Sequence, residues 1–362
     1  MNDAGHNAGP IDAVITWVDG ADPAHAARLA AYLDSIGAGR PNAAHPTRFN
    51  DAGEIDYCVA SIFRFAPWIR TLHVVTDRQA PRLIGQLAGT RFADRVRVVD
   101  HAELFAGHAQ HLPTFNSRAI ITTLWRIDGL SERFVYFNDD FALIRPVRPD
   151  DFFRDERVVL RGKWQRQSAH RPLRKLIAAA RRMAGKDPAR SPTARVRNLA
   201  AQEASARMAG FDRDYLRLYH NPFPMRRSTL EHFFAERPDL LEANLRHRLR
   251  SPAQFKTEVL AAHLEAAQGN AVFDARLHAV QLKPSEQWFP RMRRRMANAD
   301  RDENAAFVCV QSLELAPPRV QASIRDWLDR RIGRLAEVLA HATMREAGAV
   351  AGSGLEDLRG DI

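Results

Sequence analysis

The sequence of 362 residues has few cysteines and no long apolar run. Only Cys58 and Cys309 are present, which excludes a small scaffold held together by disulfides and favours buried thiols in the reducing cytoplasm. Nowhere do about 18 consecutive apolar residues occur, so we expect no membrane-spanning helix. The first ten residues lack both a basic start and an apolar stretch, and we expect no signal peptide.

Two common kinds of site are also missing from the sequence. There is no Gly-rich phosphate loop, and no group of Cys or His has zinc-finger spacing. His101, His108 and His111 lie close together, but their intervals do not match one face of a helix, so we interpret them as surface histidines of a loop and not as a metal site. The hydrophobic content of 45% is enough for a substantial core, and the length predicts one large domain or two ordinary ones.

Positive charge is concentrated in one segment. The net charge is +10, and residues 161–207 alone carry 13 Lys and Arg against Asp187 and Glu203, a net charge of +11. Such a segment suits the anionic inner membrane leaflet, nucleic acid or a polyanionic substrate. A solvated helical insertion explains the same charge equally well.

The first 150 residues alternate between short apolar runs and amphipathic stretches, which is typical of βαβ units around a parallel sheet. We therefore predict the α/β class, with an open, mostly parallel, Rossmann-like sheet. The predicted strands span 13–18, 71–76, 96–99 and 133–137. The predicted helices span about 24–36, 54–65, 80–89 and 116–127, with a terminal amphipathic helix over 320–342 that docks on the core.

Acidic side chains follow three of these strands. Asp19 comes after the first strand, Asp77 after the second, and Asp139 and Asp140 after the fourth. In open α/β sheets, ligands bind outside the carboxyl ends of the strands. The sequence therefore predicts a nucleotide-sugar site at this edge of the sheet.

The run Asn138-Asp139-Asp140 ends a buried strand with an amide and two carboxylates. Paired acids next to a core are costly unless something positive lies against them, and Mg²⁺ prefers one or two carboxylates plus substrate phosphates. A metal or substrate site is one interpretation, and a cap of the following turn is the other.

Other candidates are weaker when each is taken alone. Thr16, Trp17, Asp19 and Gly20 convert the first strand into a turn before a helix, where backbone donors suit phosphate and Asp19 suits a sugar hydroxyl. An ordinary N-cap by Asp22 before Pro23 explains the same turn. Additional candidates are Asn116 and Ser117 at a helix start, the loop residue His220 as a proton acceptor, and Arg250 as a phosphate ligand.

Several blocks in this order resemble the Stealth family of sugar-phosphate transferases, which includes bacterial capsule polymerases and the animal lysosomal-enzyme N-acetylglucosamine-1-phosphotransferase. The first block is Ile11 to Pro23. The second opens with Arg48-Phe49-Asn50-Asp51 and ends at Phe137-Asn138-Asp139-Asp140; the third runs from Tyr219-His220-Asn221-Pro222 to Arg250-Ser251, and a weak fourth is Phe307 to Val310.

The resemblance implies a fold like that of nucleotide-sugar transferases. It implies transfer of a sugar 1-phosphate from a nucleotide diphosphate sugar to a hydroxyl of a growing capsule or exopolysaccharide, with release of nucleoside monophosphate. His220 matches the proposed base, Arg250 the phosphate arginine, and Asp139 and Asp140 the pair linked to a divalent cation, Mg²⁺ or Mn²⁺. The substrate-binding positions it implies are Thr16, Trp17, Asp19, Gly20, Arg48, Asp51, Asn116, Ser117 and Asn138.

The sequence departs from the family pattern at two places. Ile121 stands where many relatives have an acid, and Gln311-Ser312 follow Cys309-Val310 where the fourth block often reads Cys-x-Asn-Asp. A different donor, a different acceptor, altered metal dependence or reduced activity would each be consistent with these losses.

We predict four regions along the chain. They are an α/β core (11–150), a basic helical insertion (151–210), the second half of the catalytic domain (211–315) and a C-terminal helix with a tail (316–362). The expected partners are the sugar donor, a polysaccharide or oligosaccharide acceptor and the inner membrane, which the basic segment would contact peripherally; nucleic acid is not expected. An ordinary glycosyltransferase and a non-catalytic anion-binding protein are the alternative functions.

Overall fold

A computed structural model describes residues 9–37, 41–171, 183 and 195–340. Its centre is a sheet in the order β10-β4-β1-β2-β3, in which β4, β1, β2 and β3 are parallel and β10 is antiparallel to β4. The sheet contains β1 (Ile11–Thr16), β2 (Ile69–Thr76), β3 (Val96–Asp100), β4 (Arg133–Asn138) and β10 (Phe223–Arg226). The four strands predicted from the sequence and the α/β class are confirmed.

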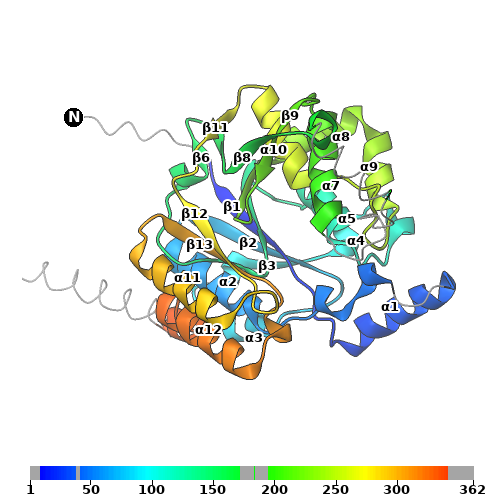
Figure 1. The fold of residues 1–362 in the computed structure, drawn as a ribbon. Helices are drawn as coiled ribbons and strands as arrows, with labels where there is room; N and C mark the ends of the chain where they lie inside the picture. The colour runs from blue at the N-terminus through cyan, green and yellow to red at the C-terminus, as the bar shows by residue number, and fades with distance from the viewer. Residues whose placement is uncertain (1–8, 38–40, 172–182, 184–194, 341–362) are drawn as a thin grey trace, which may run out of the picture.

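The central strands are buried because they are apolar on both faces. Five of the six residues of β1 and of β4 are buried, as expected for parallel strands covered by helices on both sides. Figure 1 shows α7 to α10 on one side of the sheet and α2, α11 and α12 on the other. The helices are α1 (Pro23–Ser35), α2 (Glu54–Phe65), α3 (Leu83–Leu87), α4 (His101–Leu104), α5 (Ser117–Thr122), α7 (Arg195–Met208), α8 (Arg227–Glu236), α9 (Pro238–Leu245), α10 (Thr257–Ala267), α11 (Phe289–Arg301) and α12 (Pro318–Arg331).

Three smaller sheets join the second half of the chain to the first. Their orders are β12-β13-β5, β11-β7-β6 and β8-β9. Their strands are β5 (Phe141–Leu143), β6 (Phe153–Arg154), β7 (Arg157–Leu160), β8 (Gly162–Arg166), β9 (Asp214–Leu218), β11 (Ala271–Phe273), β12 (His278–Leu282) and β13 (Ala305–Val310). One apolar core runs through these parts, from Ile11 to Leu339. The division into four regions stays a prediction.

Some predicted helices are shorter than expected. The segment 80–89 forms only α3, and 116–127 forms α5 followed by a single 3-10 turn at Leu124–Arg126. The terminal helix is interrupted because Gly333 adopts a left-handed φ of 86°, which ends α12 before residues 335–340 become helical again. Docking of this segment on the core is confirmed, since the six apolar positions at its predicted helical spacing are buried: Ile324, Trp327, Leu328, Ile332, Leu335 and Leu339.

The interpretation of three histidines as surface residues was wrong for two of them. His101 begins α4 directly after β3 and is buried, and burial lowers its pKa to about 4. His111 is buried against Glu242, a partner distant in sequence. The expectation of buried free thiols is confirmed for Cys58 and Cys309. In the described part of the chain, no helix has the length and apolarity to cross a bilayer.

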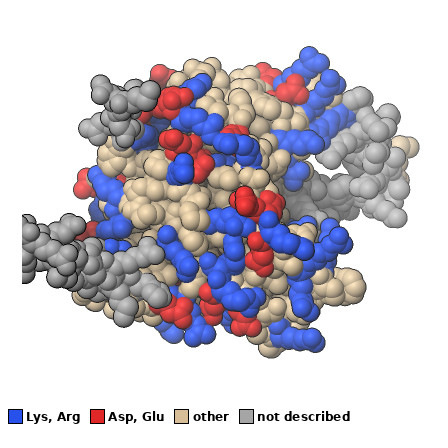
Figure 2. Space-filling view, turned by 90° about the vertical axis from the view of Figure 1, so that its left-hand side faces the viewer, with Lys and Arg blue, Asp and Glu red and all other residues tan. Residues whose placement is uncertain are grey.

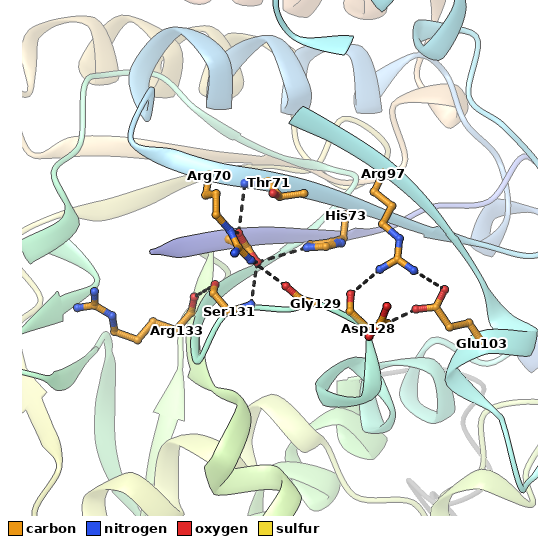
Figure 3. A network of polar contacts seen from close by, with 10 residues as sticks. Arg70, Thr71, His73, Arg97, Glu103, Asp128, Gly129, Ser131 and Arg133 are labelled. Atoms are coloured by element: carbon orange, nitrogen blue, oxygen red, sulfur yellow. Dashed lines mark hydrogen bonds and ion pairs between the residues drawn. The ribbon is translucent and has the colours of Figure 1, made fainter. Parts of the chain in front are cut away.

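A buried carboxylate ties the central strands together (Figure 3). Asp12 of β1 is fully buried and accepts hydrogen bonds from Arg70 Nε at 2.9 Å and Nη2 at 2.6 Å, from the backbone N–H of Thr71 at 3.2 Å and from that of Ser131 at 2.8 Å. His73 Nε2 lies 3.4 Å from the same carboxylate. The network thus joins β1 to β2 and to the loop that enters β4.

These contacts decide the charge state of Asp12. Burial alone would raise the pKa of its carboxyl group, but the hydrogen bonds from His73, Arg70 and the backbone outweigh burial and hold the pKa well below its usual range. Arg97 makes a parallel connection in the same view, donating to Glu103 and to the backbone carbonyl of Asp128.

Replacing Asp12 by Asn should destabilise the fold by about 1–3 kcal/mol, because the NH₂ group of Asn cannot accept the hydrogen bond of a buried donor such as the Ser131 N–H. A carboxyl group with a depressed pKa contributes stability above its unfolded pKa of about 3.9, and that contribution is lost as the pH falls below this value. Denaturant unfolding of the wild type at pH 7 and pH 3 should therefore show a larger acid loss than D12N. The control is D34N, at an exposed position on α1; equal losses in wild type and D12N would contradict the role of Asp12.

Candidate active site

The predicted site lies where the strand order reverses. From β1 the chain moves outward to β2 and β3 and then returns to β4 on the other side of β1, so the carboxyl ends of β1 and β4 are neighbours at a topological switch point. Thr16 and Asn138 are paired across these two ends. The buried Tyr136 hydroxyl donates to Asn138 Oδ1 at 2.6 Å, so the Thr16 hydroxyl, 2.9 Å away, donates to Tyr136. A hydrogen-bonded chain therefore orients both predicted residues.

Asp139 and Asp140 form the turn between β4 and β5. The Asp140 N–H donates to Asp139 Oδ1 at 3.1 Å, the Val310 N–H donates to the Asp140 carbonyl at 2.9 Å, and the Cys309 thiol lies 3.5 Å from Asp140 Oδ2. Asp140 Oδ1 is buried and has no hydrogen-bond partner among the described residues. An orphaned carboxylate oxygen of this kind is costly unless a ligand completes it.

The electrostatics of this turn favour a bound cation. Burial, followed by the charge of Asp140 and of the nearby Glu54 and Asp51, raises the pKa of Asp139 well above its usual value. Burial also raises the pKa of Asp140. Two carboxylates that repel each other in a dehydrated turn, one with an unsatisfied oxygen, are the ligands that Mg²⁺ or Mn²⁺ takes in proteins. The residues present therefore fit a divalent cation.

Glu54 is a member of this acidic group that the sequence analysis did not single out as a site residue. It begins α2, accepts the N–H of Ala52 at 2.6 Å, and burial raises its pKa to about 7. Asp51 beside it accepts the Trp17 indole N–H at 2.9 Å and the Gly53 N–H at 2.8 Å. The signal for Glu54 was present, since it lies in the opening stretch of the second resembling block, but first-turn acids are usual on any helix.

The turn after β1 is held by local contacts. Asp19 Oδ1 accepts the Ala21 N–H at 2.8 Å, while the Asp19 backbone is bonded in both directions to the Gln79 amide. Gly20 donates to the Phe49 carbonyl at 2.6 Å, and a Cβ on Gly20 would lie 2.6 Å from the Phe49 Cβ. Only glycine fits this approach between the first and second blocks. Asp22 also caps α1, as the alternative explanation of this turn supposed.

Three arginines, Arg48, Arg118 and Arg250, lie near one another, and the charge of Arg250 reaches Asp140. Arg250 donates to Ser117 Oγ at 2.5 Å, and Arg118 Nη1 donates to the Ser251 carbonyl at 3.1 Å. Lost hydration, followed by the charges of Arg48 and Arg118, lowers the pKa of Arg250, but the side chain is exposed to solvent, so it stays charged near pH 7. The Arg250 charge in turn opposes the raised pKa of Asp140. Converging cations of this kind bind a multiply charged anion such as a diphosphate.

Asn116 connects the start of α5 to the segment that carries Arg250. It is fully buried and caps α5, and its amide donates to the His247 carbonyl at 2.7 Å and to Gln254 Oε1 at 2.8 Å. Its hydrogen-bonding groups are engaged with the protein, so the structure gives Asn116 a positioning role next to Ser117. Both predicted residues are therefore close to Arg250, but only Ser117 contacts it.

His220 lies in the wall of a large pocket. The pocket has a volume of about 1010 Å³ and is lined by β8, α7, β9, β12 and α11. Burial, followed by the charges of Lys256 and Lys283, lowers the pKa of His220 to about 4, so its imidazole is neutral near pH 7. The basic side chains in the lining are Lys163, Arg217, Lys283, Arg291 and Arg295.

The charge around the pocket continues on the surface. Figure 2 shows the face on which β12 and α11 lie, and Lys and Arg dominate its lower half, with Asp and Glu in smaller groups among them. Arg293 and Arg294 of α11 are exposed, next to the pocket residues Arg291 and Arg295. Much of the predicted basic segment, 172–182 and 184–194, lies outside the described residues, although Lys163 and part of α7 line the pocket.

Glu258 connects the pocket to the arginines. It is buried in the first turn of α10 and pairs with Lys256 at 2.7 Å. Its charge acts on the pKa of His220, Arg250 and Tyr136, so it lies near all three groups. Among the residues that the structure describes, no hydrogen bond or ion pair joins His220 directly to Asp139 or Asp140. Glu258 does not stand out in the sequence, because Lys-Thr-Glu before an apolar run also marks any helix start.

Two family models match the chain. Stealth protein CR1, conserved region 1, matches residues 9–37, and Stealth protein CR2, conserved region 2, matches residues 48–160. The chain belongs to the Stealth family. The matched regions carry Thr16, Trp17, Asp19 and Gly20 and the segment from Arg48 through Asp140.

Curated Stealth relatives are longer than this chain. Exopolysaccharide phosphotransferase SCO6023 of Streptomyces coelicolor is 37% identical over 246 residues, which cover 68% of this chain and 38% of that protein. Capsular polysaccharide phosphotransferase LcbA of Aeromonas hydrophila is 39% identical over 153 residues, covering 41% of this chain and 40% of that protein. The chain thus spans about two fifths of the length of these relatives.

A solved structure with a partial likeness is the galactosyltransferase LgtC in complex with donor and acceptor sugar analogs. The TM-score is 0.37 at 12% identity, over 83% of this chain and 86% of that one, which is too low to assign a shared activity.

The two departures from the Stealth pattern lie in different surroundings. Ile121 is buried in the core, where an acid would have no room for water. Gln311 accepts from the Gln281 amide at 3.1 Å, so the end of β13 stays polar but uncharged. Ser312 adopts a left-handed φ of 54°, a conformation that Asn and Asp favour among non-glycine residues.

Replacing Asp139 and Asp140 together by Asn should stabilise the metal-free protein by on the order of 1–3 kcal/mol at pH 8, because it removes two carboxylates whose charged forms are disfavoured by burial and mutual repulsion. The same change should abolish any increase in melting temperature on adding Mn²⁺ or Mg²⁺. Calorimetry with and without the cation measures both effects. A wild type that neither gains stability from the cation nor is less stable than the double variant would contradict the metal assignment.

Proposed function

We propose that this Stealth chain transfers a sugar 1-phosphate from a nucleotide diphosphate sugar to a hydroxyl of a capsule or exopolysaccharide, releasing nucleoside monophosphate. The observation that carries the proposal is the juxtaposition of an acid pair with an unsatisfied carboxylate oxygen and three arginines at a topological switch point. Opposite charges around one point suit a diphosphate that brings its own cation. The names of the curated relatives agree with this chemistry.

The residues then divide the work of phosphoryl transfer. Asp139 and Asp140 would hold Mg²⁺ or Mn²⁺, which neutralises charge on the diphosphate when bound. Arg250, oriented by Ser117, supports the transferred phosphate from the other side, and Arg48 and Arg118 add to the positive field. Phosphoryl transfer needs positioning and charge stabilisation more than covalent participation by the protein.

The remaining predicted donor contacts lie along the β1 and β4 ends. Thr16 and Asn138 are oriented through Tyr136, and the turn at Asp19 and Gly20 presents backbone groups at the edge where nucleotides bind in open sheets. Trp17 donates its indole N–H to Asp51 and lies directly after β1 at this edge of the sheet. We assign these residues to donor binding.

The acceptor approaches from the basic pocket. His220 is neutral at physiological pH and lies in the pocket wall, so it is available to take the proton of an attacking hydroxyl. The lysines and arginines of the lining suit an acceptor that already carries phosphodiesters. We further propose that the exposed arginines of α11 hold the chain near polyanions or the anionic inner membrane face, as the cytoplasmic location predicted from the thiols would allow.

The alternative of ordinary glycosyl transfer differs in which bond breaks. In the proposed reaction the acceptor oxygen bonds to the β-phosphorus, the bond from that phosphorus to the bridging oxygen breaks, and nucleoside monophosphate leaves. In glycosyl transfer the anomeric carbon–oxygen bond breaks and nucleoside diphosphate leaves. The arginines converge on the diphosphate in both cases, so product identity decides.

Purified protein incubated with nucleotide sugars, Mn²⁺ or Mg²⁺ and short acceptor oligosaccharides should release nucleoside monophosphate and form a phosphodiester. Anion-exchange chromatography identifies the nucleotide and phosphorus NMR the linkage. Nucleoside diphosphate with a glycoside product would establish the glycosyltransferase alternative. Binding of polyanions without any turnover across the donor panel would favour a non-catalytic anion-binding protein.

Replacing His220 by Ala should lower kcat by about 10²–10⁴-fold through loss of a general base. R250K keeps one positive charge but not the planar fork, and should lower kcat/KM with a smaller effect on folding. Steady-state kinetics test both, with H232A on the exposed face of α8 as the matched control. Turnover of H220A at the wild-type rate would remove His220 from the mechanism.

A further inference from the structure

Three side chains outside the proposed active site converge on one point. His111 Nε2 lies 2.6 Å from Glu242 Oε1, and His108 Nδ1 lies 3.3 Å from Glu242 Oε2. The three candidate ligand atoms all lie within 4.8 Å of one another. No other trio of His, Cys, Asp and Glu in the described ranges meets this condition.

The local backbone arranges the two imidazoles as a pair. His108 and His111 flank the one-turn 3-10 helix Ala109–His111, and their rings are nearly parallel, with an interplanar angle of 18° and centroids 6.5 Å apart. Glu242 lies on α9 and is half-exposed, so an ion has a route from solvent, while His111 is buried. Two imidazoles and a carboxylate facing one open position form the ligand set of many zinc sites.

The Gln110 side chain lies next to this cluster. If His111 Nε2 donates to the Glu242 carboxylate, the Gln110 amide nitrogen, also a donor, lies 3.5 Å from the same atom. Reversing the Gln110 amide, whose two ends are assigned from such contacts, places an oxygen beside His111 instead. With unprotonated imidazoles, His108, His111 and Glu242 then each offer a lone-pair atom within the cluster, and the Gln110 oxygen adds one beside them.

We propose that His108, His111 and Glu242 bind Zn²⁺, with the Gln110 oxygen or water in the fourth position. Tetrahedral Zn²⁺ with bonds of about 2.0–2.2 Å separates its ligand atoms by roughly 3.3 Å. The 3.3 Å between His108 Nδ1 and Glu242 Oε2 matches this value, and the 2.6 Å between His111 Nε2 and Glu242 Oε1 would lengthen when the ion enters. The ligands are the neutral imidazole and carboxylate types that Zn²⁺ takes, in contrast to the all-oxygen Asp139–Asp140 turn.

The ion would join two segments that carry the arginine cluster. From His111 the chain runs to Phe115, whose N–H donates to the Arg248 carbonyl at 2.8 Å, and then to Asn116, bonded to the His247 carbonyl. From Glu242, α9 leads into the same 247–250 segment. Zn²⁺ binding therefore fastens the loop before Ser117 to the segment of Arg250, and this support does not depend on which reaction the site performs.

The test is zinc binding by metal-free protein in excess Mg²⁺, which occupies the acid pair, with a chromophoric chelator as competitor. Wild type should bind one Zn²⁺, with a rise in melting temperature. H111A and E242Q should each weaken zinc binding by at least about 100-fold. Loss of a group that only hydrogen-bonds to a zinc ligand already costs about 10–100-fold, and these variants lose a ligand itself. Asp139→Asn with Asp140→Asn should keep the tight site, as should H232A.

E242Q nearly preserves the shape of the side chain, so it decides the case if H111A fails to fold. Zinc bound as tightly by E242Q as by the wild type would overturn the proposal. Absence of zinc binding by folded wild type would also overturn it and would reduce the cluster to a hydrogen-bonded ion pair. Neither result depends on turnover, so both are separate from the fate of the proposed transferase activity.

Discussion

The carboxylate of Asp12 is the interaction on which the rest of the structure depends. It is placed in the middle of the sheet without exposure, where an unpaired charge would cost several kcal/mol. Donors from Arg70, Thr71 and Ser131 compensate for this burial only when β1, β2 and the entry to β4 are all in register. The same register sets Thr16 beside Asn138. The ion pair of Asp12 near the amino ends of the strands therefore also determines how the candidate active site is arranged at their carboxyl ends.

The candidate active site at the carboxyl ends of the strands has the opposite character, because its charged side chains lack complete ion pairing. Burial and like-charge neighbours raise the pKa of Asp139, while lost hydration and like-charge neighbours lower that of Arg250. The shift of Asp139 shows a carboxyl group that the surrounding fold holds in place at some cost to stability, whereas Arg250 is exposed and solvent screens its charge. Such strain is expected where a ligand supplies the missing counter-charges, and stable packing elsewhere must offset it.

The sequence was most informative where a pattern is local. The apolar runs located the four parallel strands, and the acids at their ends identified the edge that carries Asp139. Contacts between distant segments could not be read in this way: Glu258 stands between His220 and Arg250 only because α10 packs beside the sheet, and Glu242 meets His111 across 131 residues. His111 was assigned to the surface because its intervals fit no helix face, yet its partner comes from another helix. The length of the terminal helix was overestimated because apolar spacing continues through Gly333, whose left-handed backbone ends α12.

The antiparallel strand β10 has a consequence for how the protein is made. Residues 223–226 cover the edge of β4, and β13 pairs with β5 and anchors the Asp140 backbone. During synthesis, the β4 edge stays open until these later strands leave the ribosome, and an open edge of apolar residues invites pairing with other chains. The hydrogen bond from Val310 that anchors the Asp140 backbone can therefore form only after residue 310 has emerged.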